Sequence, residues 1–170
     1  MGKNGKVDIQ SIIKLRDTFE EHLTGRELDR FIDSCAKELA ARLLAKVIKR
    51  TPVGDYSGDS YSCSSGKVHK GNYTPGKKGG TLRRGWTNGK GSSSSFAQEL
   101  KVHHFGNAYV IEIVNPVEYA SYVEFGHRTR GGKGWVEGHF MLTISEQEVQ
   151  RDAPKVLENK LKKKLGEIFK

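Results

Sequence analysis

The feature that most constrains the fold is an apolar stripe in the first third of the chain. Hydrophobic side chains recur there every three or four residues, at Leu28, Phe31, Ile32, Cys35, Leu39, Leu43 and Val47. This is the spacing of one face of an α-helix. The helix should end near Arg50, because Pro52 disfavours helical backbone at Thr51. The stripe predicts a long amphipathic helix, with Cys35 as a small core residue, that needs a partner for one face.

Further helices are predicted on both sides of this one. Residues 9–23 have apolar side chains near helical spacing. Thr24 and Glu27 then have the spacing of a capping box for the next helix, with Thr24 as the N-cap. The helical period returns at His139 and continues to the end of the chain. Pro154 is suited to the first turn of a helix, so residues 139–170 form either two helices or one kinked helix.

The segment between these helical regions has a different character. Residues 54–95 are rich in Gly, Ser and Lys and show no periodicity, which is typical of a functional or disordered loop. Only Leu82 and Trp86 need burial there, and the serine run 92–95 has linker composition. No Asp or Glu occurs between Ser60 and Gln98, where the basic residues are Lys67, Lys70, Lys77, Lys78, Arg83, Arg84 and Lys90.

A β-hairpin is predicted next. Phe96 to Phe105 reads as the first strand, Gly106-Asn107 as the turn, and Ala108 to Val114 as the second strand. The predicted class is therefore α+β, a small antiparallel sheet packed with N-terminal and C-terminal amphipathic helices and carrying a long mobile basic loop. We expect a single domain over 1–170, divided into helices (1–53), loop (54–95), hairpin and following block (96–130), and loop with C-terminal helices (131–170).

Composition limits the classes of function. The 170 residues carry a formal net charge of +9, which favours anionic partners. Two cysteines do not make a disulfide framework, which favours a reducing compartment. The N-terminus lacks the apolar region of a secretory signal, and no apolar run reaches the ~18 residues of a membrane span. We expect a soluble protein, intracellular when made, with no membrane contact.

No pattern indicates catalysis. The six histidines and two cysteines lack the spacing of a metal site, and no nucleophile elbow or phosphate loop is present. Glu118 and Glu124 could act as paired carboxylates, but salt bridges to Arg128 and Arg130, or to a neighbouring chain, are the better interpretation. We therefore expect no catalytic, metal or cofactor-binding residues and no enzymatic activity.

Nucleic-acid binding is the main alternative function. The acid-free segment places Tyr61, Tyr73 and Trp86 among its cations. Cations interleaved with aromatic side chains can bind phosphates and stack bases. No sequence pattern specifies a binding mode. This alternative includes a basic nucleic-acid-binding protein or a toxin-type ribonuclease.

The block from Val117 to Arg130 interleaves aromatic and acidic residues in a way that core segments rarely do. Such a mixture suits a surface that is partly buried against another molecule. The candidate assembly residues are Tyr119, Tyr122, Glu124, Phe125, Arg128, Arg130 and Trp135. The alternative is that the three rings in this block fill the core of the subunit.

Four sequence pieces occur in a characteristic order. They are Thr51-Pro52-Val53, Gly80-Thr81-Leu82-Arg83-Arg84, the string Tyr119-Ala120-Ser121-Tyr122-Val123-Glu124-Phe125-Gly126, and His139-Phe140-Met141. Together they resemble the HK97 gp10-like family of tailed-phage proteins, over roughly residues 25–170. The chain departs from the family pattern in its long insertion after Thr51-Pro52-Val53. It also has His127 where threonine is usual, and His139 where proline is usual.

The resemblance implies a structural virion protein of a phage or prophage. It implies a tail-completion or head–tail joining role at the neck, in a ring of identical subunits that is hexameric by family analogy. The implied partners are the head connector or stopper and the tail-tube proteins, with a possible passing contact to genomic DNA. The implied location is the host cytoplasm during assembly and then the virion neck or tail.

Overall fold

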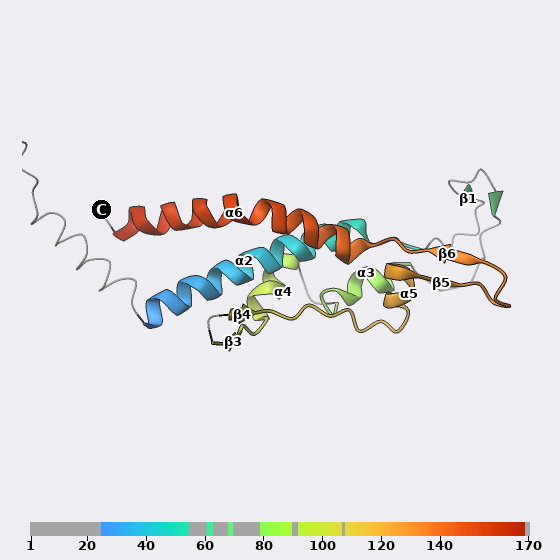
Figure 1. Cartoon of the computed structure of the whole chain (residues 1–170), viewed down its shortest axis with the longest axis horizontal. Helices are drawn as coiled ribbons and strands as arrows, with labels where there is room; N and C mark the ends of the chain where they lie inside the picture. The colour runs from blue at the N-terminus through green and yellow to red at the C-terminus, as the bar shows by residue number, and fades with distance from the viewer. Residues whose placement is uncertain are drawn as a thin grey trace, which may run out of the picture.

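The computed structural model describes residues 25–54, 61–62, 68–69, 79–89, 92–106 and 108–168. Two long helices dominate it, α2 (Arg26–Arg50) and α6 (Met141–Ile168). They lie side by side and run in opposite directions, with the shorter elements arranged along one side of the pair (Figure 1). Together with short antiparallel strand pairs, these helices make a mixed α+β fold, which confirms the predicted class.

Helix α2 confirms the predicted amphipathic helix and its end at Arg50. Its buried face is shifted from the predicted stripe and consists of Cys35, Ala40, Leu44 and Val47. Leu28 is exposed, because the burial of α2 is concentrated from its middle to its C-terminus.

The predicted capping box of α2 is wrong. Gly25 is the N-cap and makes no side-chain cap, and Glu27 instead pairs with Arg30 at 2.8 Å. Thr24 and the predicted helix 9–23 lie outside the described residues.

Helix α6 is a single helix with Pro154 in its interior, so it does not begin again at that residue. An internal proline removes one backbone hydrogen bond and costs about 3 kcal/mol in an unsupported helix. Contacts to α2 hold the helix on both sides of Pro154. On one side Glu148 pairs with Lys46 at 3.1 Å, and on the other Lys160 donates to the carbonyl of Ser34 at 2.5 Å.

The core lies where α2 and α6 meet two short helices, α3 (Thr81–Gly85) and α4 (Ser93–Glu99). Its buried members are Ala40, Leu44, Val47, Leu82, Trp86, Ala97 and Met141. The predicted burial of Leu82 and Trp86 is thus confirmed. The loop interpretation of the serine run is wrong, because Ser92 and Ser95 form a reciprocal capping box that begins α4.

The predicted hairpin exists but is shorter than expected. Strands β3 (His103–Phe105) and β4 (Ala108–Val110) pair in antiparallel register, with Phe105 opposite Ala108. The sequence from Phe96 belongs to α4, not to a strand. After Val110 the chain leaves the hairpin because Ile111 and Ile113 turn to pack on the core.

Two hydrogen bonds attach this hairpin to α2. His104 lies 3.0 Å from Asp33, and the hydroxyl of Tyr109 donates to Asp29 at 2.8 Å. The bond to Asp29, with its negative charge close by, raises the pKa of Tyr109 above its usual value.

The remaining strands form separate pairs. After α5 (Ala120–Phe125), β5 (Gly126–Arg128) pairs with β6 (Trp135–Glu137) in a hairpin that projects from one end of the helical body (Figure 1). Strands β1 (Tyr61–Ser62) and β2 (Val68–His69) form a third pair. The strands therefore do not join into the one small sheet that the sequence predicted.

Candidate assembly site

Thr51 and Trp86 join two segments that are far apart in the sequence. The indole N–H of Trp86 donates to the Thr51 hydroxyl at 2.8 Å, and that hydroxyl donates to the carbonyl of Val47 at 2.6 Å. Arg83 donates to the Thr51 carbonyl at 2.7 Å. Thr51 and Trp86 are buried, so this junction fixes the segment after α2 against α3. Arg83 is therefore a positioning residue inside the subunit and not a free cation of a basic loop.

Gly54 and Gly79 meet directly at this junction. A Cβ atom on Gly79 would lie 2.0 Å from the carbonyl oxygen of Gly54 and 2.9 Å from a methyl carbon of Val53. The close approach requires glycine at position 79. Arg84 is exposed and donates to the Gly79 carbonyl at 3.2 Å. The other predicted basic residues, Lys67, Lys70, Lys77, Lys78 and Lys90, lie outside the described residues.

Glu124 is buried, with 5% of its surface exposed. Its two carboxylate oxygens accept the backbone N–H groups of Leu142 and Thr143, each at 2.9 Å, and the Thr143 hydroxyl also donates to it at 2.8 Å. A helix leaves its first N–H groups without partners inside the helix, and a negative charge there is favourable. Glu124 therefore anchors the beginning of α6. Its predicted salt bridge to Arg128 or Arg130 within the subunit is wrong, and its candidate role at an interface stays a prediction.

The backbone around Glu124 explains two glycines of the sequence block. His139 and Phe140 donate to the carbonyls of Val123 and Glu124 at 2.8 and 3.0 Å. A Cβ atom on Gly138 would lie 2.2 Å from the Glu124 carbonyl oxygen, so no larger residue fits there. Gly126 has a positive φ of 83°, and its Cβ atom would lie 2.4 Å from the Val136 carbonyl oxygen. The two chain segments approach closely only because both residues are glycine.

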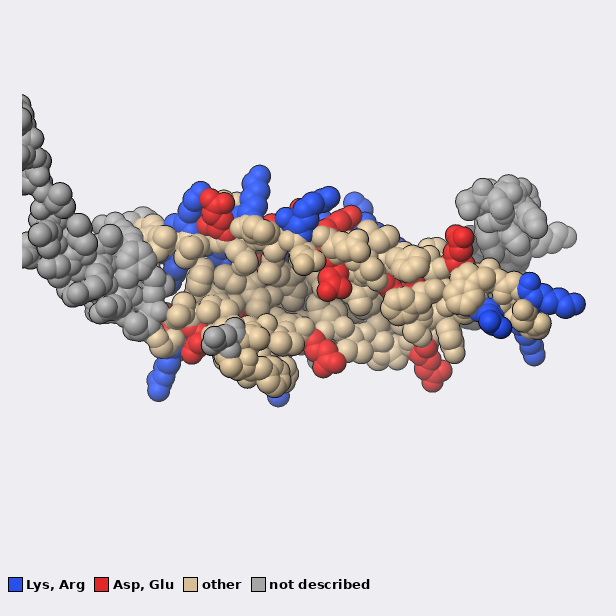
Figure 2. Space-filling view, in the orientation of Figure 1, with Lys and Arg blue, Asp and Glu red and all other residues tan. Residues whose placement is uncertain are grey.

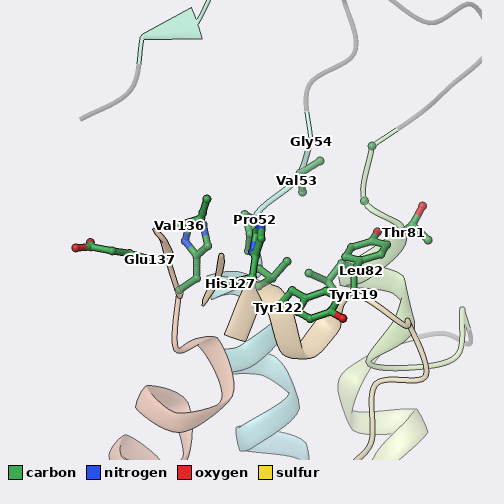
Figure 3. Close-up of a pocket in the computed structure, with 14 residues that line it drawn as sticks. Pro52, Val53, Gly54, Thr81, Leu82, Tyr119, Tyr122, His127, Val136 and Glu137 are labelled. Atoms are coloured by element: carbon green, nitrogen blue, oxygen red, sulfur yellow. The ribbon is translucent and has the colours of Figure 1, made fainter. Parts of the chain in front are cut away.

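The junction and the block together enclose a groove of about 520 Å³. Pro52 and Val53 line it from the segment after α2, and Leu82 lines it from α3. Tyr119, the N-cap of α5, and Tyr122 within α5 line the other part. In Figure 3 the two tyrosine rings lie beside Leu82, and Glu137 extends away at the opposite side. The groove is apolar over most of its lining, yet it is open to solvent. It is thus shaped to receive an apolar side chain from another molecule.

The aromatic side chains of the block do not fill the core of the subunit. Tyr122 is 59% exposed, Phe125 60% and Trp135 59%, and Tyr119 is also exposed. A tilted contact joins the rings of Tyr122 and His127, with centroids 5.8 Å apart. The alternative in which the three rings of the block form the core is therefore wrong for the isolated subunit. An exposed cluster of large apolar residues marks an interaction surface.

The arginines that follow the block lie on the β5–β6 hairpin. Arg128 is in β5 and Arg130 lies in the turn, and both are exposed. Neither forms an ion pair with a described residue.

An ion cluster on another side of the molecule joins the two long helices. Glu148 lies 3.1 Å from Lys46 and 2.8 Å from Arg50, and Asp152 lies 3.4 Å from Lys46. Hydrogen bonds from Lys46 and Arg50 lower the pKa of Glu148, and the bond to Glu148 raises the pKa of Lys46. Arg50 also donates to the buried hydroxyl of Ser145 at 2.8 Å. This cluster sets the position of α6 along α2.

The described ranges contain no group of three or more His, Cys, Asp or Glu side chains placed to hold a metal ion. None of their helices has both the length and the apolar character needed to cross a bilayer.

Sequence reasoning missed several residues of this site. Thr51, Gly138 and Val136 gave no signal as single residues, because their importance comes from contacts with distant segments. The feature that could have identified Thr51 is its position directly before a proline, at the end of a strongly predicted helix. Glu124 was identified, but with the wrong role.

Comparison with known proteins agrees with these features. A family model described as "Bacteriophage HK97-gp10, putative tail-component" matches residues 13–126, about two thirds of the chain. The match includes the junction and the sequence block up to Gly126. Searches of curated proteins and of solved structures give no match. The chain therefore belongs to the HK97-gp10-like family of bacteriophage tail components.

Proposed function

We propose that this phage tail component is a tail-completion protein that joins the head connector or stopper to the tail tube at the virion neck. It would assemble from the host cytoplasm as a closed ring of identical subunits, with a hexamer as the expected size. Its role would be structural and not enzymatic. Membership of the family supports a place in the tail, and the exposed aromatic groove supports contact between subunits.

The observation that carries this proposal is the groove itself. Tyr119, Tyr122 and Val136 are all exposed and line one continuous hollow. Removing apolar surface from water is favourable by about 25 cal/mol per Å². Covering these gathered side chains would therefore stabilise an assembly. Tyr119 and Tyr122 lie in the segment that the family model matches. We infer that the occupant of the groove is a second copy of this chain.

A ring made by rotation needs two different surfaces on each subunit, because each copy meets its two neighbours in different ways. The chain offers a second apolar surface. Phe105, at the turn of the β3–β4 hairpin, is 66% exposed. That hairpin lies toward the other end of the molecule from the β5–β6 hairpin (Figure 1). The chain from Val110 at the end of that hairpin to Tyr119 at the groove can span no more than about 30 Å.

The two surfaces are complementary in shape and charge. Phe105 projects from a tight turn, whereas the groove is a hollow of about 520 Å³, within the range that buries a compact ligand. No acidic residue occurs between Lys101 and Ile111, and Glu137 lines the groove. We therefore place Phe105 of one copy in the groove of the next. Repetition of this contact closes a ring if the rotation between neighbours permits it.

Mixing two complementary variants tests the proposal. Phe105→Ser removes the projecting ring and leaves the groove intact, whereas Tyr122→Ser damages the groove and leaves Phe105 intact. Sedimentation equilibrium over a concentration series would give the masses. Each variant alone should remain a monomer. In an equimolar mixture, Phe105 of the Tyr122→Ser chain can enter the intact groove of the Phe105→Ser chain. Assembly should stop at this heterodimer, because its free groove and its free position 105 are both altered.

Leu161→Ser is the matched control. Leu161 is an exposed apolar residue on α6 that belongs neither to the groove nor to the β3–β4 hairpin, so this variant should assemble as the unmodified chain does. A Phe105→Ser variant that assembles fully would show that Phe105 is not the occupant of the groove. An unmodified chain that stays monomeric at every concentration, and also when tails are assembled from its partners, would contradict the ring.

A further inference from the structure

The β5–β6 hairpin has two distinct faces. Its antiparallel register sets His127 opposite Val136 and Arg128 opposite Trp135. Because side chains alternate between the faces of a strand, each of these pairs occupies its own face. His127 and Val136 line the groove, so the pair of Arg128 and Trp135 faces away from it. The second face takes no part in the proposed contact between subunits.

This second face and the adjoining turn carry an excess of positive charge, because three cations face one carboxylate, Glu137, which the same alternation places on the side of Trp135. Arg128, Arg130 and Lys133 are exposed, and no acidic residue occurs between Phe125 and Val136. None of the three cations has an ion pair or side-chain hydrogen bond among the described residues. Figure 2 shows these blue side chains gathered at the projecting end of the molecule.

The charges on the long helices are arranged differently. There Arg42 pairs with Glu38 at 2.8 Å, Lys162 pairs with Glu158 at 2.5 Å, and Lys46 pairs with Glu148. Positive charge on the helical body is thus partly neutralised inside the subunit, whereas on the hairpin it is left for another molecule.

We propose that this face of the β5–β6 hairpin binds the phosphate backbone of a nucleic acid. Duplex DNA carries one negative charge for every ~1.7 Å of its axis, so phosphates are spaced closely enough for each of three neighbouring cations to contact one. The exposed ring of Trp135 lies beside Arg128 and adds a surface on which a base can stack. The turn glycines Gly131 and Gly132 have open space around them, which leaves room for a backbone to approach closely. An acidic protein surface would satisfy the cations but would leave Trp135 without a planar partner.

This inference does not depend on the proposed ring. It adds a candidate contact with nucleic acid outside the basic segment 54–95, in which Arg83 is engaged by Thr51. A monomer would bind through the same three cations, and closure of a ring would bring several such arms together.

Fluorescence anisotropy with the full chain tests the inference. The probes are a short labelled duplex DNA and a labelled single strand of the same composition, titrated between roughly 50 and 200 mM salt. The test variant replaces Arg128, Arg130 and Lys133 by Gln. The control variant replaces Lys49, Lys101 and Lys155 by Gln, three exposed cations on other parts of the molecule. Both variants lose the same net charge, and both should keep the unfolding midpoint of the unmodified chain.

The hairpin variant should bind at least tenfold more weakly. The slope of log K against log salt should fall in magnitude by about 2.7, because each phosphate contact in duplex DNA contributes about 0.9. The control variant should change the slope by less than the value of about 0.9 that one phosphate contact contributes. Trp135→Ala should weaken the single strand about tenfold and the duplex little if single-stranded nucleic acid is the source of the phosphates.

Three results would overturn the inference. They are no binding by the unmodified chain at the lowest salt, equal losses in the hairpin and control variants, and displacement of the DNA by polyglutamate at equal charge concentration. The last result would assign the face to an acidic protein.

Discussion

The indole N–H of Trp86 lies 2.8 Å from the hydroxyl of Thr51, and both residues are buried. This one hydrogen bond joins the segment that follows α2 to the end of α3. Through Pro52 and Leu82, the same two segments supply one wall of that groove. The junction therefore connects the stability of the subunit to the surface through which we propose that it assembles.

Thr51→Val should reduce the free energy of unfolding by about 1–3 kcal/mol. The substitution keeps the volume of the side chain but leaves the buried N–H of Trp86 without an acceptor. Urea denaturation would measure the loss. Adding Trp86→Phe to this variant should cost less than the same change costs in the unmodified chain, because the hydrogen bond is already lost there and the change removes an unsatisfied donor. Fully additive losses would mean that the bond between the two side chains contributes nothing.

Glu124→Ala should lower the free energy of unfolding by about 1.5–3 kcal/mol, because a charged acceptor of three hydrogen bonds is removed from the beginning of α6. Glu124→Gln keeps one acceptor oxygen and should lose less. Urea unfolding of the dilute monomer is the measurement. If Glu124→Ala unfolds as the unmodified chain does and only fails to assemble, Glu124 belongs to an interface after all.

The ion cluster between α2 and α6 predicts a loss of stability in acid. The pKa of Glu148 is lowered in the folded chain, so its contribution is present above the unfolded carboxyl value of about 4.3. That contribution disappears as the pH falls through the lower, folded pKa. Glu148→Gln should therefore reduce the dependence of the unfolding midpoint on pH at acid pH. Identical acid limbs in the two proteins would contradict this role.

Lys46 predicts a loss of stability at high pH. Its pKa is raised, so its contribution is complete below the unfolded value of about 10.4 and is lost as the pH rises through the higher, folded pKa. Lys46→Met should reduce the dependence of the midpoint on pH in alkali. Tyr109, whose pKa is also raised, titrates in the same range, so the comparison is made in a Tyr109→Phe background.

The contact of Gly54 with Gly79 predicts that the segment between them can be removed. A variant that lacks residues 55–78, with a short Gly-Ser link in their place, should fold with unchanged or higher stability, because each halving of a loop recovers about 0.6 kcal/mol of closure entropy. The midpoint of thermal unfolding is the measurement. Deleting residues 92–95 is the control and should destabilise the chain, since it removes the cap of α4. A chain that cannot fold without residues 55–78 would show that they support the core.

Regular spacing made part of this fold predictable from the sequence. Helix α2 followed from its apolar period, and the turn of the β3–β4 hairpin followed from Gly106. Helix α4 did not, because a serine run has the composition of a linker, and only the reciprocal bonds of Ser92 and Ser95 show that it caps a helix.

The site was less accessible to such reasoning. The sequence identified the aromatic block, but an alternation of acids and aromatics does not tell which side chains face inward. Glu124 is buried and Tyr122 exposed, the reverse of their ordinary preferences. The reason lies in α6, whose first N–H groups need an acceptor where Glu124 stands. The groove depends on Pro52, Leu82 and Tyr122, which meet only in the folded chain.

Cysteine cross-linking tests the central claim most directly. In a background with Cys35→Ala and Cys63→Ser, the double variant Ala108→Cys/Ser121→Cys keeps Phe105 and the groove intact and places one thiol beside each proposed surface of every subunit, at exposed positions next to Phe105 and Tyr122. After oxidation, the account predicts a ladder of covalent multiples that ends at one closed ring in non-reducing gels. It also predicts that neither single-cysteine variant forms a dimer by itself. A covalent dimer from either single variant, or no ladder from the double variant under conditions of assembly, would contradict a head-to-tail ring built from Phe105 and the groove.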